Sequence, residues 1–392
     1  MNPLEQQLAY PHGQAVPAPG RAVEVAPGVR WLRMGLPFAL DHINLWLLRD
    51  RQGGIDGWTI VDCGIADAST RAAWEQVFEQ ELEGLPVLRV IVTHMHPDHI
   101  GLAQWLTERW PQGGVPCRLW ISATDWNAAR MAVQSTTGFG GAAAATHFGT
   151  HGVRDAATLD KVRRRSNYFA SMVPAVPPSH RRLMDGMVFD IGGRAWRCIA
   201  GFGHAPEHIS LYCEDLGTLG AGALPASRAA IERQAMLGAP ADGRGTDVPA
   251  GRAVLISGDM LLPKITTNVS VIDLEPEADP LRLYLDSIER LRALAPDTLV
   301  LPSHGRPFVG VPTRIAQIRA HHDERLAEVM EACGRAPCSA FELLPVLFKR
   351  SLDLHQTTFA LGEAIAHLHA LWFAGRLVRT QDAEGVYRFA PA

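Results

Sequence analysis

The sequence predicts an α/β fold that ends in a smaller C-terminal unit. Runs with the two-residue period of strands are interspersed with segments of helical period, and several predicted strands end directly in polar side chains. A long predicted helix is broken by Gly334 and Pro337 ahead of the remaining chain. A length of 392 residues fits one or two domains with sizeable cores.

The first part of the chain is predicted to begin with antiparallel strands. A helix then covers Ala66–Leu82, because its apolar residues recur on one face. Pro97 suits the first turn of a further helix, where its missing N–H costs nothing. The predicted strands of this part are Val29–Leu36, Ile43–Leu48, Gly57–Val61 and Pro86–Val92.

Two stretches in the middle of the chain interrupt the strand pattern. Residues 123–182 are predicted to be mostly helical, with a Gly/Ala-rich break at Gly138–Ala145, and their length suggests a lid or a substrate wall. Gly217–Arg252 is rich in Ala, Gly and Pro, so we expect a surface insertion there, partly disordered. Further strands are predicted at Arg118–Ile121, Ala195–Ala200, His208–Cys213, Ala253–Ile256 and Thr298–Leu301.

The C-terminal part is predicted to be helical before it closes with a hairpin. A helix over Asp279–Ala293 is followed by a long helix over Arg314–Cys333, whose apolar stripe includes His322, expected to be a buried structural residue. We divide the chain into an extension over 1–21, a main domain over 22–312, and a linker helix with a tail over 313–392. In the tail we expect helices Ala340–Phe348 and Thr357–Gly375 and a hairpin of Leu377–Thr380 with Val386–Phe389.

Composition excludes several classes of protein. The net charge of −4 gives no general attraction to nucleic acid or to anionic membranes. Six cysteines spread along a long chain do not predict a disulfide framework. The first residues lack the basic start and apolar run of a secretory signal, and no run is long enough to span a membrane. We therefore expect a cytoplasmic protein.

The densest polar motif is His94-x-His96-x-Asp98-His99, at the end of a predicted strand. Neutral imidazole and carboxylate are the usual ligands of zinc and similar metals. Three imidazoles this close together are a burden to packing unless something binds them. The spacing therefore predicts a metal site at a turn from strand to helix.

The motif resembles the HxHxDH signature of the metallo-β-lactamase superfamily. The remaining family motifs follow in order: His204 in Gly203-His204-Ala205-Pro206-Glu207-His208, Asp259 after Ser257-Gly258, and His304 after Pro302-Ser303. Upstream, Asp62 matches the first motif of the family. The resemblance implies a four-layer αβ/βα sandwich, and the tail is similar to the winged-helix domain of one branch of the superfamily.

The resemblance also implies a dinuclear metal centre. One metal would be held by His94, His96 and His204, a second by Asp98, His99 and His304, and Asp259 would bridge both. Asp62 would orient ligand imidazoles, and Asp98 could transfer a proton. The two divalent ions are expected to be zinc, although these ligands also accept iron or manganese.

The implied activity is hydrolysis by a metal-bound hydroxide. We expect a small-molecule ester, thioester or lactone as the substrate, without a membrane partner and with a homodimer as an open alternative. The resemblance to the branch that includes glyoxalase II and the lactamase-β-like endoribonuclease leaves two other readings. One is a metal-dependent endoribonuclease, disfavoured because the tail over 336–392 has balanced charges. The other is a non-catalytic binding protein, which would lack a ligand, whereas all seven ligand positions are filled.

Several weaker signals receive structural interpretations. Glu207 stands where the family often has Gly; it could bind substrate or cap a strand, and a structural role is favoured. His208 is expected to support the site without ligating a metal. The segment Gly138–Ala143 fits the dinucleotide pattern G-x-G-x-x-A, but a helical run precedes it. His42 could approach the rim of the site, but a turn residue is favoured. His147 and His151 are expected on the surface, although a lid could place one of them over the substrate, and Cys333 with Cys338 is not expected to bind metal.

Overall fold

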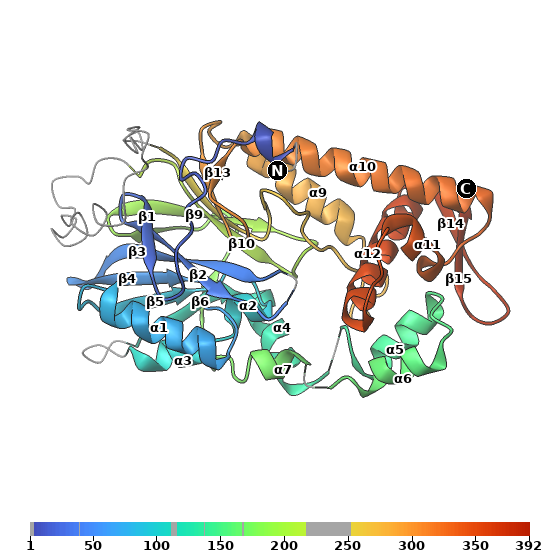
Figure 1. The fold of residues 1–392 in the computed structure, drawn as a ribbon, viewed down its shortest axis with the longest axis horizontal. Helices are drawn as coiled ribbons and strands as arrows, with labels where there is room; N and C mark the ends of the chain where they lie inside the picture. Colours follow the sequence, from blue (N-terminus) through green and yellow to red (C-terminus); the bar gives the residue numbers. More distant parts are fainter. Residues whose placement is uncertain (1–3, 39, 111–115, 137, 167, 217–251) are drawn as a thin grey trace.

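The computed structural model describes residues 4–38, 40–110, 116–136, 138–166, 168–216 and 252–392. Two β-sheets lie face to face, with helices on the outer face of each (Figure 1). This is the predicted four-layer sandwich. Residues 217–251, which include most of the predicted Ala/Gly-rich insertion, lie outside the described residues.

The first sheet has seven strands in the order in which they occur in the chain. Its first four strands are antiparallel, and Gly53 and Gly54, both with positive φ, make the tight turn between the third and the fourth. The remaining pairs are parallel. The strands are β1 (Ala22–Ala26), β2 (Val29–Gly35), β3 (His42–Gln52), β4 (Ile55–Val61), β5 (Val87–Ile91), β6 (Arg118–Ser122) and β7 (Arg181–Leu183).

The second sheet has six strands in the order β13-β12-β11-β10-β9-β8. Within it, only the pair β11 and β12 is parallel among the described strands. The strands are β8 (Val188–Ile191), β9 (Arg194–Gly201), β10 (His208–Cys213), β11 (Val254–Gly258), β12 (Leu299–Pro302) and β13 (Phe308–Val309). Each sheet therefore has parallel neighbours whose carboxyl ends meet at one edge.

Three apolar layers hold the four structural layers together. Trp46 and Trp196 lie in the layer between the sheets, and Trp74 lies between the first sheet and its helices. Those helices are α1 (Ala68–Gln80), α2 (Pro97–Ile100) and α3 (Ala103–Arg109). The second sheet is covered by α9 (Pro280–Arg290), the short η2 (Leu291–Ala293) and α10 (Val311–Arg335), as Figure 1 shows.

The predicted helical stretch contains four helices: α4 (Ala123–Gln134), α5 (Gly141–Thr150), α6 (Ala156–Arg164) and α7 (Tyr168–Met172). The predicted break at Gly138–Ala145 is too long, because α5 begins at Gly141. Its run of alanines has high helix propensity. Because α4 precedes this glycine segment, the dinucleotide pattern has no strand before it. The residue after α5, His151, contacts the C-terminal part, since its carbonyl accepts from Phe341 N at 3.1 Å.

The C-terminal tail has the predicted order of two helices and a hairpin: α11 (Ala340–Leu347), α12 (Leu354–Phe373), β14 (Leu377–Gln381) and β15 (Tyr387–Pro391). Capping boxes at Ser339 and Asp353 begin the two helices. Leu343, Ile365 and Phe389 belong to the same apolar core as α9 and α10. The tail is thus packed as a continuation of the sandwich core.

The N-terminal extension contains the short η1 (Glu5–Gln7) and packs on the second sheet. Ala9 pairs with Val309 of β13, and Leu8 is buried beside it. The backbone hydrogen bonds of this edge strand are thereby partly satisfied. None of the described helices combines the length and the apolar character needed to cross a membrane.

Candidate metal centre

The motif residues gather where strands of both sheets end. β4 and β5 are parallel and lead into Asp62 and Thr93, whereas β11 and β12 are parallel and lead into Asp259 and His304. Gly258 is required at this edge, because its φ is 54° and an added Cβ would lie 2.1 Å from His208 Nε2. With the loop between β9 and β10, which carries His204, the two sheets therefore bring five separate loops to one place.

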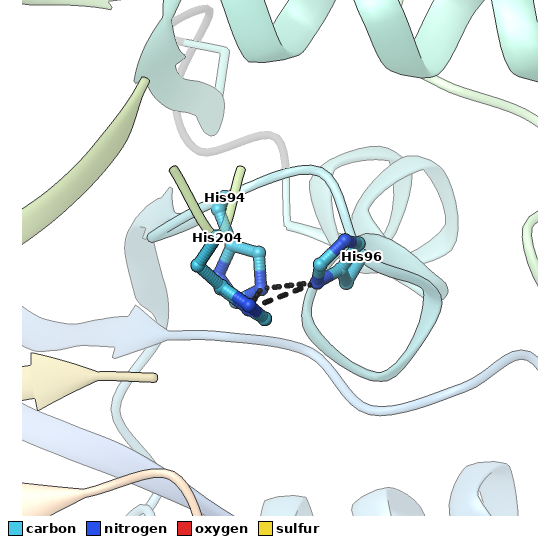
Figure 2. A group of neighbouring side chains, drawn as sticks. All are labelled: His94, His96 and His204. Atoms are coloured by element: carbon cyan, nitrogen blue, oxygen red, sulfur yellow. Dashed lines mark hydrogen bonds between the residues drawn. The ribbon is translucent and has the colours of Figure 1, made fainter. Parts of the chain in front are cut away.

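Three imidazoles form the first ligand group (Figure 2). His94 Nε2 lies 2.9 Å from His96 Nδ1 and 3.2 Å from His204 Nε2. His96 Nδ1 lies 3.1 Å from His204 Nε2. The three ring nitrogens face one point, and this group could hold one metal ion.

The second group adds carboxylates to imidazoles. Asp98 Oδ2 lies 3.7 Å from His99 Nε2 and 3.5 Å from His304 Nε2, and these three residues could hold an ion. Asp259 Oδ1 lies 3.6 Å from His99 Nε2 and 3.5 Å from His304 Nε2. The other oxygen of Asp259, Oδ2, lies 3.3 Å from His204 Nε2, so its carboxylate contacts both groups.

The chemistry of these side chains fits divalent cations. Burial and neighbouring imidazoles hold the pKa of His94 and of His96 well below the usual range, so both rings are neutral and keep a free lone pair. Burial lowers the pKa of His99, but Asp62, Asp98 and Asp259 outweigh it and raise the value to about 10. His99 Nε2 and Asp259 Oδ1 are buried without a hydrogen-bond partner among the described residues. A cation would satisfy both atoms and the negative field around them.

Asp62 orients the second group from behind. Its Oδ2 lies 2.8 Å from His99 Nδ1, and its Oδ1 accepts from Thr93 N at 2.8 Å. The backbone of Asp62 adopts a positive φ of 62°, which is unusual for a residue other than glycine. Because Nδ1 is directed at Asp62, His99 presents Nε2 to the centre. An outer carboxylate fixes the orientation of a ligand histidine in the same way in metal sites.

Backbone carbonyls fix two further imidazoles. His204 Nδ1 donates to Asn268 O at 2.8 Å, and His304 Nδ1 donates to His42 O at 2.7 Å. His42 Nε2 also accepts from Gly305 N at 2.9 Å. The interpretation of His42 as a turn residue is therefore wrong: it begins β3 and supports the loop that carries His304.

Asp125 is a supporting residue that sequence reasoning missed. Its Oδ1 accepts from Met95 N at 2.7 Å, and its Oδ2 accepts from Glu207 N at 2.6 Å. It thus joins the loop that carries His94 and His96 to the segment that follows His204. Burial raises its pKa to about 6 despite these bonds. The local sequence shows only Ser122 capping α4 with an acidic residue three positions on, which does not indicate distant partners.

The remaining residues of the site region do not belong to a ligand group. Glu207 accepts from Thr124 Oγ1 at 2.7 Å, and His208 Nε2 accepts from Asp259 N at 3.2 Å. Both contacts are those of supporting residues.

Three further histidines and two cysteines lie outside the site. His147 and His151 are buried, not on the surface as predicted, because α5 packs against the C-terminal part. His322 is buried as predicted. Cys333 Sγ lies 3.1 Å from Cys338 Sγ, and among the described residues no metal-ligating group includes either cysteine.

Comparison with known families identifies the fold and the tail. Residues 39–222 match the model of the metallo-β-lactamase superfamily, and residues 326–392 match that of the metallo-β-lactamase-like C-terminal domain. A crystal structure of a β-lactamase domain protein from Burkholderia ambifaria is 52% identical over 100% of both chains, with a TM-score of 0.85. The chain belongs to the metallo-β-lactamase superfamily. The predicted family and fold class are thus confirmed, while the winged-helix character of the tail stays a prediction.

Other members of the metallo-β-lactamase superfamily align over most of the chain. A metallo-β-lactamase family protein from Thermus thermophilus is 25% identical, with a TM-score of 0.65, over 94% of this chain and 100% of that one. "Probable metallo-hydrolase YqjP" of Bacillus subtilis is 25% identical over 357 residues, which are 87% of this chain and 91% of the relative. The likeness therefore includes the tail as well as the sandwich.

Proposed function

We propose that this protein is a metallo-hydrolase that cleaves a small-molecule ester, thioester or lactone. It would use two divalent cations, and zinc is the expected metal for both. The observation that carries the proposal is the arrangement around Asp259. Its two carboxylate oxygens contact one imidazole of the first group and two imidazoles of the second. Such a carboxylate suits two neighbouring cations. Homology to a probable metallo-hydrolase supports the same reading.

The side chains divide the work between binding and proton transfer. Cations bound there would lower the pKa of a water molecule and polarise the attacked carbonyl. His94 and His96 provide neutral nitrogens, His204 provides a third imidazole nitrogen, and Asp98, Asp259, His99 and His304 supply the remaining ligand atoms. Asp98 retains 17% side-chain exposure, so it can reach a substrate and hold a proton between the water and the leaving group.

Charge placement supports a carbonyl substrate over RNA. Two of the basic residues of the tail are committed to ion pairs: Arg379 binds Glu277 at 3.0 Å, and Arg388 binds Asp382 at 2.9 Å. Arg388 also contacts Glu342 at 2.6 Å. A surface that follows a phosphate backbone needs cations free to replace its counter-ions. These arginines are already neutralised by carboxylates of the chain.

The proposal is tested by elemental analysis of the purified protein, joined to hydrolysis of lactones, thioesters, a β-lactam and a short RNA. We expect about two metal ions per chain, as in two-metal hydrolytic sites, and turnover of a carbonyl substrate that chelation abolishes. His96→Ala should lower kcat/KM roughly 1000-fold, which corresponds to a rise of about 4 kcal/mol in the activation free energy.

His180→Ala serves as the matched control, because His180 stacks on Trp126 outside the ligand groups. Its metal content and turnover should equal those of the wild type. No bound metal after expression in metal-supplemented medium would contradict the proposal, and so would cleavage of the RNA alone.

A further inference from the structure

A cluster of rings, half-buried except for the exposed Phe38, surrounds His355 in the first turn of α12. The His355 ring centre lies 4.8 Å from that of Phe359, 5.6 Å from that of Tyr168 and 6.2 Å from that of Phe38. Phe139 stacks on Phe359 at 4.1 Å. With Arg165, whose guanidinium lies 5.3 Å from the Tyr168 ring, these residues form what we call the aromatic rim.

The aromatic rim adjoins the metal centre on two sides. Tyr168 begins α7, which packs against α2, the helix of Asp98 and His99. Burial raises the pKa of the Tyr168 hydroxyl, Arg165 lowers it, and Asp98 raises it, so the ring lies within electrostatic reach of a ligand carboxylate. On the other side, Phe38 stands four residues before His42, whose carbonyl accepts from His304 Nδ1.

The tail contributes to the aromatic rim through α12. Its Gly362 carbonyl accepts from Val271 N at 3.1 Å, in the segment whose Asn268 carbonyl accepts from His204 Nδ1. In Figure 1, α12 extends from the tail toward α7. Three segments distant in the sequence, namely the β2–β3 loop, the helical stretch and α12, thus meet beside the ligands.

Arg165 is the cation of the aromatic rim, and it has no counter-ion among the described residues. Its Nη1 donates to Phe139 O at 3.1 Å and to Thr358 Oγ1 at 3.4 Å, and both partners are neutral. The adjacent Arg164 instead binds Asp160 at 2.9 Å. Arg165 is only partly buried, so its guanidinium can be reached from solvent, and a planar guanidinium without a carboxylate partner suits the carboxylate of a ligand.

We propose that the aromatic rim binds the part of the substrate remote from the bond that is cleaved, and that this part is a planar apolar group bearing a carboxylate. The half-exposed rings would stack on the planar group, while Arg165 would pair with the carboxylate. The inference rests on the proposed function and names its substrate class: an anionic aryl ester or thioester. In hydrolysis, water oxygen bonds to the acyl carbon, the bond to the leaving oxygen or sulfur breaks, and a water proton goes to the leaving group.

The test uses two esters of the same shape on the full-length, metal-loaded protein, 4-acetoxybenzoate and 4-acetoxybenzamide. The wild type should prefer the anionic ester by about tenfold in kcat/KM, through KM, as one charge-assisted hydrogen bond provides. Arg165→Gln should abolish the preference with kcat unchanged. Arg165→Lys, which keeps the charge but not the planar fork, should retain part of it.

Arg164→Gln is the matched control and should keep the full preference. Calorimetric binding of 4-hydroxybenzoate and 4-hydroxybenzamide separates this inference from the proposed function, because it requires no turnover. A preference in binding that depends on Arg165, without hydrolysis of either ester or of the lactones and thioesters tested above, would uphold the aromatic rim and contradict the proposed function. Equal binding of the two ligands, or a preference that Arg165→Gln leaves intact, would overturn the inference even if both esters are hydrolysed.

Discussion

The chain buries histidines in two regions, and the two sets behave differently. In the metal centre, His99 and His304 are surrounded by carboxylates. Along α5, α10 and α12, the imidazoles lie among apolar side chains and other imidazoles, and His369 alone of this set also has carboxylates, those of Glu277 and Asp279, acting on its pKa. These helical histidines are His147, His151, His322, His367 and His369.

The comparison shows that burial alone does not determine what a histidine does. Burial lowers the pKa of His151 to about 3, and that of His322 to about 3, because no carboxylate opposes it. Burial acts on His99 in the same direction, yet three carboxylates raise the pKa to about 10. The carboxylates therefore distinguish the second ligand group, where they raise the pKa of His99 and His304, from the helical histidines; His94 and His96 of the first group have a lowered pKa, as the helical histidines do.

Replacing Asp62 should make His99 resemble the helical histidines. Asp62→Ala removes the acceptor of His99 Nδ1 and of Thr93 N, so the imidazole loses both its fixed orientation and a raising charge. We expect metal affinity to fall by about 10–100-fold, as loss of an outer carboxylate does elsewhere. Competition with a chelating dye measures the change.

The control for that variant is Asp185→Ala, which removes a carboxylate bound to Arg290 on the surface. Its metal affinity should equal that of the wild type. If Asp62→Ala also bound metal with unchanged affinity, the orienting role of Asp62 would be refuted.

Replacing Asp125 tests whether the metal centre depends on the position of its loops as well as on the carboxylates around its histidines. Asp125→Ala leaves the backbone N–H groups of Met95 and Glu207 without their acceptor, at a cost of about 1–3 kcal/mol in unfolding free energy for each buried donor. We also expect about a tenfold loss of turnover, the lower end for outer residues of metal sites. Asp125→Asn keeps one acceptor oxygen and should recover part of the stability and part of the turnover. Equal turnover in Asp125→Ala, Asp125→Asn and the wild type would exclude a role of Asp125 in positioning the ligand loops.

The helical histidines should make the fold sensitive to mild acid. Because the pKa of His151 is about 3 in the folded protein and about 6.5 when unfolded, acid protonates the unfolded chain first. One such histidine lowers the unfolding free energy by about 1.4 kcal/mol between pH about 7.5 and about 5.5. In His151→Gln, the decrease in unfolding free energy between these two pH values, measured by urea titration, should be smaller by about 1.4 kcal/mol. A decrease equal to that of the wild type would show that His151 is not buried in its neutral form.

Most of the fold and the ligand set could be predicted because both depend on residue patterns that are local in the sequence. His94, His96, Asp98 and His99 lie within six residues, and strand periodicity located the ends from which Asp259 and His304 project. Helix boundaries were near the observed ones where caps or proline mark them, as at Pro97 and Ser339. Such signals do not depend on distant parts of the chain.

The residues that were missed depend on contacts distant in sequence. The carboxylate of Asp125 bonds to Glu207 N, 82 residues away, and the carbonyl of His42 accepts from His304, 262 residues away. The burial of His147 and His151 could not be predicted because the C-terminal elements against which α5 packs, such as α12 with His369 beside His151, begin some two hundred residues later in the chain. A polar residue in a helix is buried or exposed according to its neighbour, which the local sequence does not specify.

The length of α10 limits the insertions and deletions that this chain can tolerate. The helix has 25 residues and so spans about 37 Å, with Ile315 and Ile318 in its first half and Val329 and Cys333 near its end all in the apolar core. Inserting one residue between these halves would rotate everything beyond it by about 100° and shift it by about 1.5 Å. His355 would then leave its place opposite Tyr168, although no residue of the metal centre had changed. Insertions and deletions in this helix should therefore be tolerated only when the number of residues added or removed is close to a whole number of helical turns. This constraint acts on the length of the helix and not on the identity of its residues.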